Sequence, residues 1–186
     1  MQYKLTTPCT AEDLAPLKAG DTVLLSGVVY TARDQAHKRM LEALDKGEKL
    51  PFDLEGSAIY YVGPTPERPG EIIGSAGPTT SGRMDAMSPR LLDLGNKIMI
   101  GKGKRDAAVK EAVVRNGAVY LAALGGAGAL MAQSVKTLEV IAWPDLGCEA
   151  VRRLTVEDMP LTVILDAHGG GLYLSGPEAY REAQVK

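Results

Sequence analysis

The sequence predicts an α/β fold with a mixed β-sheet, on the strength of two observations. Short runs rich in β-branched residues alternate with segments whose apolar residues recur every three or four positions, the spacing of a helix with one buried face. Crossovers of this kind make strands parallel, whereas a turn-rich stretch between two apolar runs near the C-terminus predicts an antiparallel hairpin. With 186 residues, 45% of them hydrophobic, the chain can bury one core, so we expect a single domain over residues 1–186.

The first half of the chain should contain strands and helices that are separated by glycine and proline. β-branched and aromatic runs bounded by turn residues indicate strands, and apolar residues at helical spacing indicate helices. Glycine and proline between these segments mark the turns and loops. We expect strands at residues 21–30, 58–62 and, briefly, 71–75, and helices at residues 32–44 and 88–94.

The second half begins with an alternating pattern that predicts a βαβ unit. Its two strands should be parallel, and its crossover should be right-handed. We expect strand 97–100, helix 106–115 and strand 118–124 in this unit, then strands 138–142 and 161–166. The last of these leads into a turn-rich stretch at 168–171, and residues 172–174 are expected to complete the hairpin.

The charge and hydropathy of the chain exclude several classes of function. The formal net charge is −2, so there is no large field of one sign to attract nucleic acid or an anionic membrane. The longest uncharged stretch, residues 116–133, is interrupted by glycines, which argues against a membrane span. The N-terminal residues lack the long apolar stretch of a secretory signal, so a cytoplasmic location is expected.

The chain contains two cysteines, Cys9 and Cys148, far apart in the sequence. They form no CxxC pair, and no third cysteine is present to complete an iron-sulfur or zinc site. We therefore expect no metal site in this chain. Both cysteines are interpreted as ordinary small hydrophobic residues of a reducing compartment.

The stretch 74–85, GSAGPTTSGRMD, predicts an anion-binding loop. Glycines and hydroxyl residues let backbone N–H groups approach an anion closely, and an arginine can bind a carboxylate with two parallel hydrogen bonds. The alternative is a flexible surface turn with a solvated arginine. The candidate residues are Thr79, Thr80, Ser81, Arg83 and Asp85.

Two further clusters of candidates follow predicted strands. Arg33 and His37 lie four positions apart at the start of a helix, where Asp34 suits the helix dipole, although a simple helix cap with a surface ion pair explains them as well. Lys102 stands between two glycines at the end of a strand, where ligand sites of α/β sheets gather, although short charge runs are often merely solvated.

A glycine cluster at residues 125–128 follows a strand and invites comparison with dinucleotide-binding turns. The full GxGxxG spacing is missing, because Met131 occupies the place of the last glycine. A tight turn that opens a closely packed helix explains the cluster equally well.

Several blocks of the sequence together resemble the beta subunit, or fused C-terminal domain, of class I fumarate hydratases. The blocks are TARDQAH, AIYYVGPTPERPGEIIGSAGPTTSGRMD, IGKG and GCEAVRRLTVEDMPLTVILDAHGGGLY, which span the chain from about Gly20 to Tyr173. GPTTSGRMD is the most specific of them. The beta subunits of L(+)-tartrate dehydratase share the same plan, so they are the close alternative.

The resemblance implies a swivelling β/β/α-type domain that closes over a partner alpha subunit, whose three cysteines hold a four-iron four-sulfur cluster. It also implies that Arg33, Thr79, Arg83 and Lys102 contact a dicarboxylate substrate, with Thr79 as the base for the carbon-bound proton. Because a threonine hydroxyl is a weak base, we expect Lys102 or nearby amides to stabilise its alkoxide. Thr80 and Ser81 are not distinguished from Thr79 by sequence, and Asp34, His37 and Asp85 are assigned supporting roles. No role is implied for Cys148.

The resulting hypothesis is a hydro-lyase subunit that interconverts fumarate and (S)-malate, inactive without its alpha partner. A hetero-oligomer is expected, with a homodimer as an option for the isolated chain. Two other classes of function stay open at this point. One is a stand-alone anion-binding or nucleotide-binding module, and the other is a structural cap on a partner that carries every catalytic group.

Overall fold

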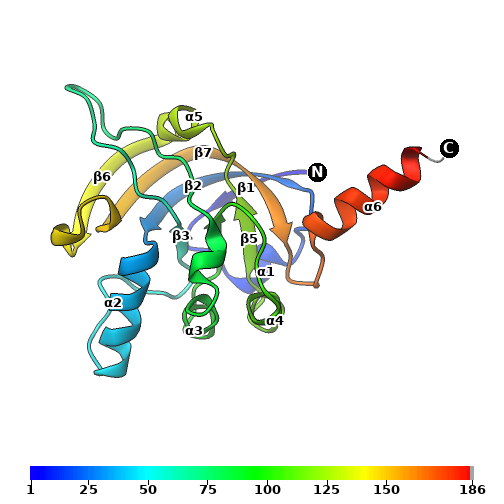
Figure 1. Cartoon of the computed structure of the whole chain (residues 1–186), viewed down its shortest axis with the longest axis horizontal. Helices are drawn as coiled ribbons and strands as arrows, with labels where there is room; N and C mark the ends of the chain where they lie inside the picture. Colours follow the sequence, from blue (N-terminus) through cyan, green and yellow to red (C-terminus); the bar gives the residue numbers. More distant parts are fainter. Residues whose placement is uncertain (185–186) are drawn as a thin grey trace.

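The computed structural model describes residues 1–184, which form one mixed sheet with helices packed around it (Figure 1). The seven strands lie in the order β1-β2-β3-β4-β5-β7-β6, and β2 pairs in addition with β7. This extra pairing closes β2, β3, β4, β5 and β7 into a small barrel. The strands are β1 Gln2–Thr6, β2 Thr22–Thr31, β3 Ala58–Tyr60, β4 Ile98–Gly101, β5 Val119–Ala122, β6 Val135–Ala142 and β7 Val151–Leu165.

Strand direction determines where the loops gather. Neighbouring strands from β1 to β5 are all parallel, whereas β7 runs antiparallel to β2, β5 and β6. Thr31 of β2 pairs with Tyr60 of β3, and Gly101 of β4 pairs with Ala122 of β5. The carboxyl ends of β2, β3, β4 and β5 therefore meet at one edge of the barrel.

The helices cover the outside of this barrel, and Figure 1 shows α2, α3 and α4 side by side on one face. Local capping explains where some of them start: the Asp106 side chain accepts a hydrogen bond from Val109 N at 2.9 Å, and Pro89 occupies the first turn of α3. The helices are α1 Ala11–Leu14, α2 Asp34–Asp45, α3 Ser88–Asp93, α4 Ala107–Arg115, α5 Gly128–Gln133 and α6 Leu172–Gln184, with 3₁₀ helices η1 Ser81–Met84 and η2 Pro144–Glu149.

The core has two parts, one on each face of the strands. Alternate residues of a strand point to opposite faces, so Ala58 and Tyr60 of β3 belong to one cluster, whereas Ile59 belongs to the other. The first cluster fills the barrel, and the second lies under α2, α3 and α4. Because both faces are buried, these strands read as continuous hydrophobic runs in the sequence.

The α/β class, the mixed sheet and the parallel neighbours β4 and β5 confirm the sequence predictions. The glycine cluster at 125–128 is the tight turn that opens α5. The strand expected at 71–75 is wrong, because these residues belong to a loop. Two hydrogen bonds close the base of this loop, from Thr65 N to Ser75 O at 3.0 Å and from Ser75 N to Thr65 Oγ1 at 2.8 Å. The residues between them pair with no strand.

The hairpin expected after residue 166 is also wrong. The carboxylate of Asp166 accepts hydrogen bonds from His168 N at 2.9 Å and Gly170 N at 2.8 Å, which tightens the turn. Pairing then stops at a single bridge between Leu165 and Gly171, and α6 begins at the next residue. No helix in the described part of the chain has the length and apolar character needed to cross a lipid bilayer.

Candidate functional site

The predicted site residues gather beyond the carboxyl ends of the parallel strands. Arg33 follows β2 by two residues, and Lys102 follows β4 directly. The segment 79–85 passes between them, since Thr79 N donates a hydrogen bond to Tyr61 O at 2.8 Å, just after β3. This is the edge where α/β sheets place their ligands.

The segment 79–85 continues the sheet for a short distance beyond β4. Thr80 forms a parallel bridge with Lys102, and Ser81 N donates to Lys102 O at 2.9 Å. These bonds bring the hydroxyl residues and Lys102, which are about twenty positions apart in sequence, onto neighbouring backbone segments.

The structure distinguishes the three hydroxyl groups that the sequence left undistinguished. Ser81 is fully buried, and its Oγ accepts hydrogen bonds from Lys102 N at 3.0 Å and from the Tyr120 hydroxyl at 2.9 Å. Thr79 is partly buried and Thr80 is exposed, and within residues 1–184 neither hydroxyl makes a hydrogen bond. Ser81 therefore holds the segment in place, and the two threonine hydroxyls remain available to a ligand.

Lys102 and Arg83 have no internal counterion in the described part of the chain. Lys102 is partly buried, and a Cβ added to Gly125 would lie 3.7 Å from its Cδ, so its stem runs beside the turn that opens α5. Arg83 is exposed in the last turn of η1. Neither forms an ion pair with any residue from 1 to 184. Both positive charges are thus free to meet an anion.

Arg33 caps the start of α2 and is held by two carboxylates. Its Nε lies 3.1 Å from Asp34 Oδ2 and 3.5 Å from Glu149 Oε1, and its side chain is 20% exposed. A Cβ added to Gly63 would lie 3.1 Å from Arg33 Nη1, so the glycine leaves room for the guanidinium. The two Nη groups make no hydrogen bond within residues 1–184, which is the arrangement that a forked carboxylate contact requires.

Glu149 is a functional candidate that sequence reasoning missed. Its second oxygen accepts a hydrogen bond from Gln35 N at 2.7 Å, at the first turn of α2. The 3₁₀ helix η2 that carries it is attached to α2 by a pair of contacts between Arg39 and Asp145, at 3.0 and 2.5 Å, and the Arg39 guanidinium lies 6.0 Å from the centre of the Trp143 ring. Arg33 and Glu149 are 116 positions apart, so no local pattern indicates that they form an ion pair. The one signal was that both belong to the blocks that carry the family resemblance.

His37 lies beneath Arg33 and is completely buried. Its Nδ1 is 3.2 Å from Arg33 O, and its ring packs edge-on against Tyr61 with centroids 5.2 Å apart. Nε2 has no hydrogen-bond partner among the described residues. Burial lowers the pKa of His37 to about 4, although the Arg33 carbonyl acts in the opposite direction. The imidazole is neutral at pH 7, and it is buried against the backbone of Arg33.

The buried His37 predicts a dependence of stability on pH. Below pH 6.5 the unfolded chain binds a proton at this position, whereas the folded chain does not until about pH 4. The contribution of His37 to the free energy of unfolding should therefore be constant above pH 6.5 and fall by roughly 3 kcal/mol between pH 6.5 and 4. Urea unfolding at several pH values measures this slope.

Two variants identify the source of that slope. His37→Phe should flatten the loss between pH 6.5 and 4, because the group that protonates in the unfolded chain is gone. His168→Gln is the matched control, since His168 is the second of two histidines and is exposed. An unchanged slope in His37→Phe would show that other groups cause the acid sensitivity.

Gly101 connects β4 to Lys102 and leaves space for Ser81. A Cβ at this position would overlap Ser81 Oγ and lie 3.0 Å from Tyr61 Cδ2. Gly101→Ala is therefore expected to cost about 1–3 kcal/mol of stability and to displace segment 79–85. Thermal unfolding checks the cost, and Gly125→Ala is the control, because the nearest atom to its added Cβ is 3.7 Å away. Equal unfolding temperatures for the two variants would contradict the close fit at Ser81.

Asp85 attaches the end of segment 79–85 to the residues that lead into α4. Its Oδ1 accepts from Arg105 Nε at 2.5 Å, and its Oδ2 accepts from Asp106 N at 2.8 Å. Its carboxylate thus fixes the position of the loop. Arg105 was not among the candidates from sequence, because an arginine within a charge run gives no sign of burial.

The cysteines do not fit an iron-sulfur cluster within this chain. Cys9 is 2% exposed, its thiol donates to Thr6 O at 3.4 Å, and burial raises its pKa to about 11. Cys148 is exposed on η2. Within residues 1–184 there is no group of three or more His, Cys, Asp or Glu side chains that could hold a metal ion.

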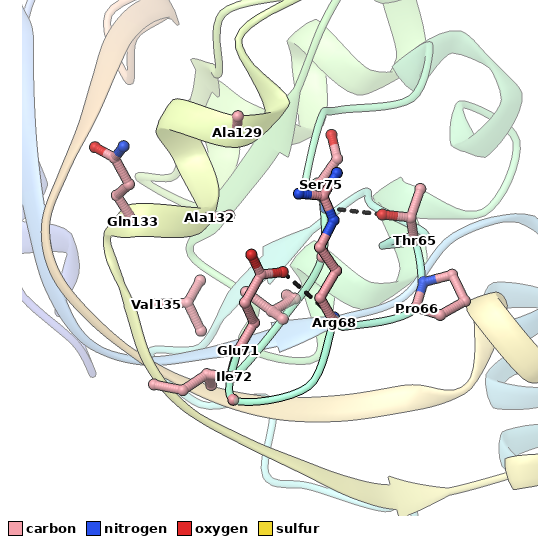
Figure 2. Close-up of a pocket in the computed structure, with 13 residues that line it drawn as sticks. Thr65, Pro66, Arg68, Glu71, Ile72, Ser75, Ala129, Ala132, Gln133 and Val135 are labelled. Atoms are coloured by element: carbon pink, nitrogen blue, oxygen red, sulfur yellow. Dashed lines mark hydrogen bonds between the residues drawn. The ribbon is translucent and has the colours of Figure 1, made fainter.

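A cavity of about 550 Å³ lies away from these residues. Figure 2 shows Thr65, Arg68, Glu71 and Ser75 on the loop side of the cavity and Ala129, Ala132, Gln133 and Val135 on the side of α5 and β6. Gly74 and Ser75, at the start of the predicted loop 74–85, line it, but none of the candidate residues does. It gives no support to a ligand site made of Arg33, Thr79, Arg83 and Lys102, which lie on an open edge.

Comparisons with known proteins identify the family. A family model described as "Fumarase C-terminus" matches residues 1–176. A putative L(+)-tartrate dehydratase subunit beta from Methanocaldococcus jannaschii is 42% identical over 170 residues, which cover 88% of this chain and 87% of that protein. The L(+)-tartrate dehydratase subunit beta of Escherichia coli is 33% identical over 187 residues, covering 98% of this chain and 92% of that protein.

Fumarate hydratases are similar to this chain over only part of their length. Fumarate hydratase 2 of Leishmania major is 39% identical over 168 residues, which cover 87% of this chain but 29% of that protein. The chain thus spans about three tenths of such relatives. Because the family model covers nearly the whole sequence, this chain belongs to the Fumarase C-terminus family.

Proposed function

We propose that this chain is the beta subunit of an iron-sulfur-dependent hydro-lyase that interconverts fumarate and (S)-malate, with an active site shared with an alpha subunit. One observation supports this most directly. Arg33, Lys102 and two free threonine hydroxyls lie beyond the ends of adjacent parallel strands, and the cations there have unused donors. Family membership supports the same class of chemistry.

The cations suit a four-carbon dianion. Each carboxylate needs its charge balanced, and the planar fork of an arginine matches a carboxylate better than a lysine does. In this proposal Arg33 and Arg83 bind the two carboxylates. Arg33 offers its two Nη groups because Asp34 and Glu149 occupy Nε. Lys102 adds a third positive charge. Its backbone N donates to Ser81 Oγ at 3.0 Å, and its stem runs beside Gly125.

Thr79 is proposed to exchange the carbon-bound proton. In the dehydration direction the proton on the carbon next to a carboxylate moves to the Thr79 oxygen, and the hydroxyl group leaves the neighbouring carbon. A threonine hydroxyl is a weak base, so the proposal needs the Lys102 ammonium to stabilise the alkoxide. A four-iron four-sulfur cluster held by the alpha subunit would supply a Lewis acid for the leaving hydroxyl. Thr79 is favoured over Ser81 because the Ser81 oxygen is already engaged by two donors.

Reconstitution tests the proposal. The isolated chain should be colourless and inactive, and anaerobic mixing with a three-cysteine alpha chain should give hydration of fumarate to malate. A reconstituted complex that carries its cluster and turns over neither fumarate nor L(+)-tartrate would refute it. Nucleotide binding by the isolated chain would instead favour the non-catalytic module.

L(+)-tartrate dehydratase is the second candidate. It is favoured by the extent of the match. Two tartrate dehydratase proteins, each named as a separate beta subunit, match this chain over 87% and 92% of their own length. Both substrates are four-carbon dicarboxylates, so the same cations serve either. Comparing kcat/KM for fumarate and L(+)-tartrate in one complex decides between them.

The Arg83→Ala variant distinguishes a purely structural cap from both enzyme candidates. Its exposed guanidinium makes no ion pair within residues 1–184, so Arg83→Ala should leave folding and assembly intact. If the residue binds substrate, kcat/KM falls sharply. Normal turnover in an assembled Arg83→Ala complex would favour the structural cap.

A further inference from the structure

Arg105 is a buried charge next to, but outside, the proposed substrate contacts. It precedes α4, and its side chain is fully inaccessible to solvent. A guanidinium loses its hydration when it is buried, and it is retained in such a place only when the surrounding groups replace the lost hydrogen bonds. The groups around Arg105 therefore show what it holds together.

Two of these groups are aromatic rings. The Arg105 guanidinium lies 5.4 Å from the centre of the Tyr61 ring and 5.0 Å from that of Tyr120, within the range of cation–π attraction. Each tyrosine in turn holds one end of the hydroxyl stretch. The backbone carbonyl of Tyr61 accepts the hydrogen bond from Thr79 N at 2.8 Å, and the side-chain hydroxyl of Tyr120 donates to Ser81 Oγ at 2.9 Å.

The remaining contacts of Arg105 involve the far end of the same segment. Its Nε donates to Asp85 Oδ1 at 2.5 Å, and its Nη2 donates to Ser88 Oγ at 2.8 Å, at the start of α3. Its Nη1 lies 3.3 Å from Met99 Sδ in β4. Arg105 thus contacts Asp85 directly, and it contacts the tyrosines that bond to Thr79 and Ser81. These three residues lie on both sides of Arg83 in the sequence.

We propose that Arg105 is a positioning residue for the reaction, which sets the place of Thr79 and Arg83 through Tyr61, Tyr120 and Asp85. This inference rests on the proposed function for its catalytic part only. A lysine cannot reproduce the role, because an ammonium lacks the planar fork that reaches Asp85 and Ser88 together and lies against two rings. A positive charge at position 105 is therefore not enough to hold segment 79–85 in place.

Arg105→Lys is the informative variant, because it keeps the charge and can keep the contact with Asp85. Arg115→Lys is the matched control: Arg115 ends α4, the helix that Arg105 precedes, and its ion pair with Asp93, at 2.8 Å, is exposed. Arg105→Met gives a second, apolar replacement. Hydrogen exchange followed by mass spectrometry compares the three variants with the native chain.

In Arg105→Lys the amides of Thr79 and Ser81 should exchange faster by tenfold or more, while β2 and β7 keep their native rates. Arg115→Lys should leave segment 79–85 unchanged. Native exchange rates in this segment in both Arg105 variants would overturn the proposal. So would equally faster exchange throughout β2 and β7, since that would indicate a general loss of stability instead of a local displacement.

Kinetics of the complete complex test the catalytic part. Small misplacement of catalytic groups costs about 100-fold in rate, so kcat/KM for Arg105→Lys should fall by that order, with kcat reduced as well as KM raised. Unchanged kcat and KM would overturn the positioning role. If the native complex hydrates no dicarboxylate, the proposed function fails, and the exchange comparison still decides whether Arg105 places segment 79–85.

Discussion

Replacing Thr79 by Val in the assembled complex is expected to lower kcat by about 10³-fold, because proton transfer by a positioned group contributes 10²–10⁴-fold. Valine has nearly the shape of threonine, and the backbone bond from residue 79 to Tyr61 O is retained. The loss should therefore be confined to chemistry, with little change in KM. Initial rates in both directions, hydration and dehydration, measure it.

Thr80→Val is the control for this experiment, because Thr80 is the adjacent exposed threonine. Its kcat should remain close to the native value. Thr79→Ser should keep part of the activity, since it keeps a hydroxyl. If Thr80→Val lost more activity than Thr79→Val, the base would have to be assigned to Thr80.

Arg33→Lys is expected to raise KM by about 100-fold. The change removes a forked contact with a carboxylate, and hydrogen bonds to charged groups contribute about 1.5–3 kcal/mol, with 1.4 kcal/mol corresponding to a factor of ten in affinity. The thermal stability should change little, since lysine keeps a positive charge beside Asp34 and Glu149. Steady-state kinetics with the reconstituted complex test the prediction.

Two companion variants define what Arg33 contributes. Glu149→Gln keeps an oxygen for Gln35 N but removes one of the two charges beside Arg33 Nε, so KM should rise less than in Arg33→Lys. Arg90→Lys is the control, since Arg90 is exposed and pairs with Asp45 at 2.6 Å, away from the site. A native KM in Arg33→Lys would remove Arg33 from the substrate contacts.

Local patterns predicted most of the strands and helices, but not how the barrel closes. The runs that became β3, β4 and β5 are buried on both faces, so their hydrophobicity is plain in the sequence. The pairing of β2 with β7 joins segments about 130 positions apart, and such non-local contacts leave no periodic signal. β7 also begins ten residues before the predicted strand 161–166. In its first half, buried apolar residues are interspersed with exposed charged ones, so the sequence shows no continuous hydrophobic run there.

The site was predictable to the extent that strand ends determine it. Parallel strands place Arg33 and Lys102 at one edge, so their common location follows from sequence order once the βαβ pattern is recognised. The ranking of Thr79, Thr80 and Ser81 required the contacts of Tyr120 and Lys102 with Ser81. Glu149 and Arg105 required three-dimensional contacts, because a charged residue gives no local sign of whether it faces water or another charge.

The attachment of η2 to α2 has a practical consequence. Trp143, the only tryptophan of the chain, begins η2 beside Arg39, and the same short helix ends at Glu149 next to Arg33. A bound acid that draws the Arg33 guanidinium toward it is expected to shift Glu149 through their ion pair, and with it η2 and the surroundings of this indole. Its intrinsic fluorescence therefore provides an optical signal for titrating dicarboxylates without an added dye.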